Sequence, residues 1–177
     1  MRWEEQIFAV LDDLEGQATA LYAAEREAEV ADRARAEYHH ITLASRLVAS
    51  VGRELAVEAR GVGRIEGELS RVADGWCLLR GPQQDWIVRL AAVALVDGAS
   101  ERSVPEVAWS PVQRLGLGSA LRRLAEAGDR CVLHLVDGTR YDGTPARVGA
   151  DFVELVTTSG QCVLVTHESL AAVQGPG

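Results

Sequence analysis

The sequence contains no lysine and no asparagine, and all 18 of its basic residues are arginine. Acidic residues number 26, which gives a formal net charge of −8. Non-specific nucleic-acid binding needs a surplus of cations to neutralise phosphates, so this balance argues against it but leaves room for a local basic patch. Arginine in place of lysine, with abundant Ala, Gly and Val, is typical of a GC-rich bacterial genome, and we expect an actinobacterial one.

Cysteine is also scarce. The chain has three cysteines, an odd number: Cys77, Cys131 and Cys162. They form no Cys-x-x-Cys motif, and each lies among apolar residues. This usage predicts buried, reduced thiols in a cytosolic protein. The N-terminus has no signal-peptide pattern, and no apolar run reaches the roughly 18 residues of a membrane span. We therefore expect a cytoplasmic protein without a membrane partner.

Large aromatic side chains make up only 5% of the chain, whereas 47% of the residues are hydrophobic. A packed core is expected at this hydrophobic content, and it must consist mainly of Val, Leu, Ile and Ala. A length of 177 residues suits one large domain or two small ones.

Proline is absent before Pro82, so nothing prevents a helix over residues 1–40. Apolar residues recur there every seven positions, which is typical of a coiled-coil or docking seam. A helix packed on its own domain is the alternative, because the later seam positions are alanines. The apolar pattern shifts near residues 38–41, so we expect a break there and a second helix ending at Gly52. The candidate seam consists of Ile7, Leu14 and Leu21.

From residue 54 the apolar period changes to two, which indicates β-strands. A linker over 98–111 contains two prolines and Trp109, which we expect to anchor it to a domain surface. A helix over 112–127 then precedes a second set of strands. The expected strands are 54–59, 64–72, 76–79, 86–90 and 93–96, followed by 131–136, 140–148, 152–157, 161–166 and 170–174.

The two strand sets follow one plan at an offset of 76 residues. Gly52 and Gly128 end the preceding helices, and Gly67 and Gly143 lie inside the long second strands, where glycine indicates a sharp bend. Agreement of helix ends, turns and strands favours an internal repeat.

The sequence thus predicts an α+β, mainly β fold, in which a long N-terminal helix precedes two tandem helix-capped five-stranded barrels. The expected domains are the helix (1–40), the first barrel (41–97), the linker (98–111) and the second barrel (112–177).

A spaced pattern of apolar residues, aspartates and glycines runs through the second strand set. It consists of Leu135, Asp137, Gly138, Tyr141 and Gly143, followed by Val148, Asp151, Phe152, Val153 and Leu155. This pattern resembles the first signature of the Sm-like family, a group of SH3-type small barrels. The resemblance implies a helix capping a five-stranded barrel, as in the plan above.

The chain also departs from that family. Sm-like proteins that grip RNA bases use an asparagine after the aspartate of the signature, and this chain has none. The second signature is missing as well: the corresponding loops are 89–92 and 166–169. The resemblance therefore extends to the fold and not to the base pocket.

No grouping of residues predicts catalysis. Four histidines, at 39, 40, 134 and 167, do not fall at metal-ligand spacings, and His134 is expected on the outer face of its strand. The serines lack a nucleophile-elbow context. Residues 116–118 resemble a phosphate loop but lack its Lys-Ser/Thr ending. We therefore expect neither an enzyme nor a cofactor.

Arginines form the strongest polar candidate set. They suit phosphates or an acidic partner, and the alternative is a solvated face paired with nearby carboxylates. The set consists of Arg114, Arg122, Arg123, Arg64 and Arg140.

Small barrels have exposed edge strands, which pair readily with another chain or with the sister barrel. Fusion in tandem suggests that the two barrels contact each other through such edges. The first hypothesis is therefore a non-enzymatic interaction or scaffold protein that binds a protein partner or itself as a homo-oligomer. The alternative is an RNA-associated regulator that contacts the phosphate backbone through arginines.

Overall fold

The computed structural model describes residues 3–175, without the side chains of 3–15, 18, 34 and 37. The chain divides into two compact units, residues 1–41 and 42–177, and each is described separately. The first unit contains helix α1 (Trp3–Tyr38). The chain leaves the helix at Tyr38, so the break expected at 38–41 is confirmed.

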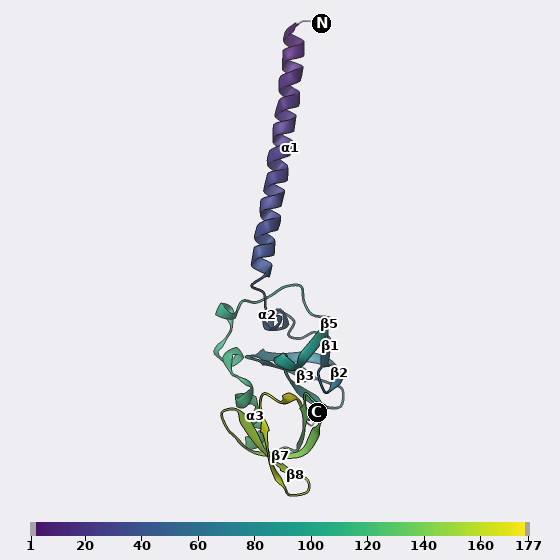
Figure 1. The fold of residues 1–177 in the computed structure, drawn as a ribbon, viewed down its shortest axis with the longest axis vertical. Coiled ribbons are helices and arrows are strands. Elements are labelled where there is room, and N and C mark those ends of the chain that lie inside the picture. The colour runs from purple at the N-terminus through teal and green to yellow at the C-terminus, as the bar shows by residue number, and fades with distance from the viewer. Residues whose placement is uncertain (1–2, 176–177) are drawn as a thin grey trace. The chain divides into compact units, whose positions relative to one another are not determined.

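Ten antiparallel strands form the body of the second unit (Figure 1). Their order across the sheet is β5-β1-β2-β3-β4-β10-β6-β7-β8-β9. The first five strands are β1 (Glu54–Ala59), β2 (Gly63–Ala73), β3 (Trp76–Arg80), β4 (Asp85–Arg89) and β5 (Val93–Asp97). The second five are β6 (Cys131–Leu135), β7 (Arg140–Val148), β8 (Phe152–Thr157), β9 (Cys162–Thr166) and β10 (Leu170–Gln174).

The prediction of two tandem five-stranded barrels is wrong. Neither half closes on itself, because β4 pairs with β10 and the ten strands form one continuous open sheet. The hydrophobic cores also cross the boundary between the halves. Trp76 and Ala73 belong to the cluster of the second half, and Ala172 belongs to that of the first. The halves therefore bury apolar surface against each other, which two independent barrels do not do.

Short helices accompany each half. Helix α2 (Leu43–Val48) begins with a capping box between Thr42 and Ser45, which satisfies two backbone N–H groups. Helix α3 (Leu117–Ala127) ends at Gly128, which has the left-handed conformation. This confirms the prediction that Gly128 ends the helix. The helix expected over 112–127 is broken, because Gly116 interrupts it and residues 111–114 form a 3-10 turn, η3.

The segment between the two strand sets is held by hydrogen bonds rather than left free. Ser100 N–H donates to Ser50 Oγ at 2.8 Å, and Val104 N–H donates to Ser45 O at 3.0 Å. Trp109 is buried and donates from Nε1 to Val104 O of the same segment at 3.1 Å. Its burial agrees with the expected anchoring role. Besides η3 (Pro111–Arg114), the described residues form the 3-10 turns η1 (Leu90–Ala92) and η2 (Glu106–Ala108).

Gly67 and Gly143 lie where neighbouring backbones approach closely. A Cβ at Gly67 would lie 2.7 Å from the carbonyl carbon of Arg80, and one at Gly143 would lie 2.9 Å from that of Val156. The register shifts after each of these glycines, in β2 between Leu69 and Arg71 and in β7 between Pro145 and Arg147. Glycine allows the approach, and the bulge increases the local twist.

The cysteine prediction holds for two residues and fails for the third. Cys77 and Cys131 are buried, and burial raises the pKa of their thiols to about 12 and about 11. Cys162 is exposed, because it lies on the outward face of β9, at the end of the sheet. No helix among the described residues is long and apolar enough to span a membrane.

Candidate functional site

The joint between β4 and β10 is the structural feature that links the two halves. Register pairs are Ala172 with Val88, Val173 with Ile87 and Gln174 with Trp86. Gly175 N–H donates to Asp85 O at 2.9 Å, so 85 and 175 are a hydrogen-bonded pair. Because such pairs alternate in an antiparallel ladder, Ile87 and Val173 form the next one.

Polar side chains bridge the joint beside this ladder. His134 Nε2 and Gln174 Oε1 lie 3.0 Å apart, and Gln174 Nε2 donates to Gln84 Oε1. The Trp86 ring packs against the His134 ring with centroids 5.2 Å apart. His134 is buried, so its expected position on the outer face was wrong: the Trp86 ring and the Gln174 side chain lie against it on a face that local alternation assigns to solvent. The bridge ties β4, β10 and β6 together.

The environment of His134 predicts acid sensitivity. Burial lowers the pKa of His134, and Arg140 adds to this effect, while the Gln174 hydrogen bond opposes it. The unfolded chain therefore binds a proton more readily than the folded chain once the pH falls below the unfolded pKa of about 6.5. We expect full stability above that pH and a loss of stability as the pH falls from there through the folded pKa. Denaturant unfolding at several pH values measures this loss.

Two histidine variants test whether the loss of stability at low pH comes from His134 and His167. Burial also lowers the pKa of His167, whose Nε2 is buried without a hydrogen-bond partner in the described part of the chain. His134→Gln should flatten the pH dependence in part, and adding His167→Gln should flatten it further. An unchanged slope in the double variant would refute the assignment.

The two ends of the sheet carry open strands. Within the part of the chain that the structure describes, strand β9 pairs only with β8, and β5 pairs only with β1. Thr157 N–H donates to Gln161 O at 2.8 Å and His167 N–H donates to Asp151 O at 2.7 Å, so the odd-numbered residues of β9 bond to β8. By alternation, the N–H of Leu164 points to the open side. The Leu164 side chain is 65% exposed, and that of Leu95 on β5 is 53% exposed.

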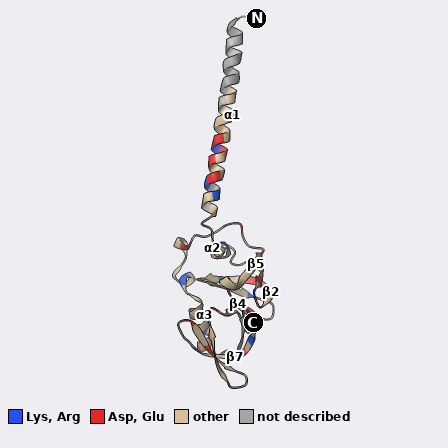
Figure 2. Cartoon of the chain, in the orientation of Figure 1, with Lys and Arg blue, Asp and Glu red and all other residues tan. Residues whose placement is uncertain are grey.

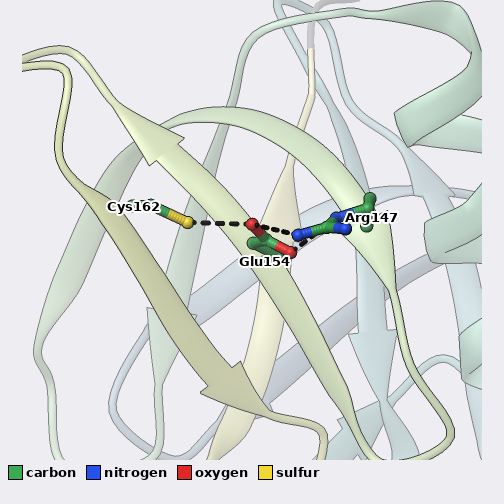
Figure 3. A network of polar contacts seen from close by, with 3 residues as sticks. All are labelled: Arg147, Glu154 and Cys162. Carbon is green, nitrogen blue, oxygen red and sulfur yellow. Dashed lines mark hydrogen bonds and ion pairs between the residues drawn. The ribbon is translucent and has the colours of Figure 1, made fainter.

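A polar network lies on the sheet beside β9 (Figure 3). Arg147 binds Glu154 through two hydrogen bonds, Nε to Oε2 at 2.8 Å and Nη2 to Oε1 at 3.0 Å, and Cys162 Sγ donates to Glu154 Oε1 at 3.1 Å. The Arg147 hydrogen bonds lower the pKa of Glu154, and the Glu154 carboxylate raises the pKa of Cys162. The thiol is therefore kept protonated and is a poor nucleophile.

The predicted arginines do not gather into one site. Arg114 donates to Glu106 O at 3.3 Å, Arg122 donates to Ser119 Oγ at 3.2 Å, and Arg123 pairs with Glu126 at 3.5 Å. Arg64 pairs with Glu66 at 2.7 Å, and that carboxylate raises the pKa of the arginine. Arg140 is exposed and lies opposite His134. Arg122 and Arg123 share α3, whereas Arg64 and Arg140 lie on different halves of the sheet.

The predicted seam falls on α1. The side chains of Ile7 and Leu14 lie outside the described residues, and Leu21 is 68% exposed. Opposite charges alternate along the last turns of the helix (Figure 2), where Arg33 pairs with Glu29 at 2.9 Å. The described part of α1 therefore presents apolar side chains such as Tyr22 and Val30 to solvent, beside a charged surface.

Sequence reasoning missed the open edge at Leu164. The available signal was the run Cys162–Val165, which is apolar at every position. A strand with one solvent face normally alternates, so continuous apolar character indicates that both faces become covered. Among the described residues, no group of three or more His, Cys, Asp or Glu is placed to hold a metal ion.

Searches of protein-family models and of curated proteins found no match for this chain. The resemblance to the Sm-like family therefore stays a prediction.

Proposed function

We propose that this chain is a non-enzymatic interaction module that joins copies of itself end to end through β9 and β5. The observation that carries the proposal is the joint between β4 and β10. The order β5-β1-β2-β3-β4 of the first half recurs as β10-β6-β7-β8-β9 in the second. In this correspondence β9 matches β4, and β5 matches β10. The open edges are thus the counterparts of two edges that already pair within the chain.

The correspondence supports the proposed internal repeat and also specifies a register. Trp76 matches Phe152 at an offset of 76, and from β4 onward the offset is 77, so that Ile87 matches Leu164. By the same offset Val96 matches Val173. The pair Ile87–Val173 therefore predicts that Leu164 of one copy lies opposite Val96 of the next.

Pairing of the two edges would be stabilised by backbone hydrogen bonds and by burial of apolar side chains. Each open strand presents unpaired backbone N–H and C=O groups, which are templates for a further strand. Pairing would also cover the exposed Leu164 and Leu95 side chains. Because the two edges differ, the contact is head to tail, and successive copies close into a ring or extend as a filament according to the rotation at each step.

Proline on the open edge tests the proposal. Leu164→Pro removes an N–H that the isolated chain does not use, so the fold should survive while end-to-end pairing is lost. Light scattering after size-exclusion chromatography should give a multiple of 19.1 kDa for the wild type and a smaller mass for Leu164→Pro. Leu164→Thr keeps the N–H and should retain most of the assembly.

Two further measurements separate the outcomes. Leu21→Glu on α1 should not affect edge pairing, so a loss of mass in this variant alone would assign association to the helical seam instead. In a Cys162→Ser background, Asp97→Cys with Val163→Cys places thiols in a non-hydrogen-bonded cross-strand pair, where the Cα separation suits a disulfide. A wild-type mass of one chain, with no disulfide-linked multimers, would refute the proposal.

The RNA alternative stays a prediction, and no specific contact favours it. Three of its arginines are engaged by carboxylate or hydroxyl groups of their own helix or strand: Arg64, Arg122 and Arg123. The cytoplasmic location and the coiled-coil use of α1 likewise remain predictions.

A further inference from the structure

A cavity of about 600 Å³ lies between the sheet of the first half and the segment from η3 to α3. Its floor comes from β2, β3, β4 and β10, and its opposite wall from Val112, Leu115 and Leu124. The lining is mostly apolar, and the volume is in the range of small-molecule sites, about 300–1,000 Å³. This cavity is separate from the open edges, so its role does not depend on self-association.

The strand register shows that the cavity lining has a charged end and an apolar end. Arg71 lies opposite Leu78, Leu78 opposite Ile87, and Ile87 opposite Val173, so one row crosses four neighbouring strands. All four residues line the cavity. At about 4.8 Å per strand the row extends roughly 14 Å from a guanidinium at one end to an apolar residue at the other. Such a row suits an extended aliphatic chain with one charged end.

The walls hold the cavity open. Trp76 Nε1 donates to Leu115 O at 2.9 Å, which joins the sheet to the segment in front of α3. Ala120 on α3 is buried and lines the cavity, and its small side chain takes up little of the space there. The half-buried floor residues Leu78 and Ile87 therefore keep apolar area that the protein itself does not cover.

Charge at the mouth favours an anion. Arg71, Arg80 and Arg123 line the cavity, against the carboxylates of Asp85 and Asp129. Asp85 lies directly opposite Arg80 in the β3–β4 register, which balances that arginine. The Arg71 side chain makes no hydrogen bond or ion pair within the described residues, and that of Arg123 has only the exposed contact to Glu126 at 3.5 Å. These two guanidinium groups are thus available to a carboxylate, which they bind in a planar, two-point geometry.

We propose that this cavity binds an unbranched aliphatic carboxylate of medium length. Its chain lies along the row from Leu78 to Val173, and its head group lies at Arg71 and Arg123. The apolar floor supplies most of the affinity by removing aliphatic surface from water. The arginines select the acid over a neutral or cationic amphiphile.

Titration calorimetry of the full chain with decanoate tests the site, with decanol and decyltrimethylammonium as matched probes. We expect saturable binding of one decanoate per chain and at least tenfold weaker binding of the other two. Arg71→Gln should weaken decanoate binding by about tenfold and leave decanol unchanged. The control is Arg147→Gln, at the corresponding position of the second half, which lies outside the cavity and should bind decanoate as the wild type does.

A second variant keeps the test decisive if Arg71→Gln is poorly folded. Leu124→Trp fills the cavity from the α3 side and should abolish binding of both decanoate and decanol. Absence of saturable decanoate binding by the folded wild type would overturn the proposal. Equal affinities for decanoate and decanol, or an unaffected Leu124→Trp variant, would overturn it as well.

Discussion

Replacing Gly61 by alanine should lower the free energy of unfolding by about 3 kcal/mol or more, because two penalties coincide. Gly61 has a φ of +75°, and the left-handed conformation costs an L-residue about 1–2 kcal/mol. A Cβ at this position would also meet Leu135 O and lie 2.8 Å from the carbonyl carbon of Val136. Those atoms are backbone, so the β1–β2 turn has to move away from the second half.

Gly63 provides the matched control for this prediction. Its φ is +95°, yet a Cβ there would have nothing within 4 Å. Gly63→Ala should therefore show the conformational penalty alone, about 1–2 kcal/mol. Thermal unfolding measures the difference, which should reach several degrees in a chain of this size. Equal melting temperatures for the two variants would show that the contact between the halves is not tight.

Replacing Ile87 by proline should destabilise the second unit by about 2–4 kcal/mol, because a ladder hydrogen bond is lost and a buried carbonyl is left unpaired. The register places the Ile87 N–H in the ladder with Val173, at the centre of the joint. Proline removes this donor and leaves the facing carbonyl without its partner in a region where Val88 and Ala172 are buried. Chemical denaturation followed by circular dichroism measures the loss.

Leu164→Pro is the control for the joint, because Leu164 matches Ile87 in the other half. The same substitution removes an N–H that faces the open edge, so it should cost far less stability at low protein concentration. A large loss for Ile87→Pro with a small loss for Leu164→Pro would distinguish a joint already paired from an edge still open. Equal losses would contradict the hydrogen-bond pattern assigned to β9.

Local features of the chain were predictable because they depend on neighbouring residues. The apolar period of two placed the strand over 140–148 at its observed bounds, and the glycine stop placed the end of α3 at Gly128. The phase shift near residues 38–41 located the end of α1. Each of these signals reflects backbone geometry within a few residues, which the side-chain pattern records directly.

The exposure of individual side chains was predicted less well than the positions of the strands. His134 alternates with apolar neighbours, and period alone put it on the solvent face, yet β10 and Trp86 bury it. Cys162 lies in an apolar run, which suggested burial, yet it lies on the outward face of β9 and is exposed. The contacts that bury His134 come from strands that the local pattern does not identify, and for Cys162 the apolar run did not show which face of the strand is open to solvent.

The amino-acid pattern thus specified the positions of the strands, the ends of α1 and α3 and the glycine bends, since these depend on short-range sterics and on alternation of side chains. The second helix ends at Val48, before the glycine stop at Gly52. Contact between the two strand sets through edge strands was expected, but only the folded chain identified the edges as β4 and β10. Their pairing turned two expected barrels into one open sheet with a free edge at each end. Strand pairing depends on register and buried area between segments about 85 residues apart, a distance in sequence over which periodicity carries no information.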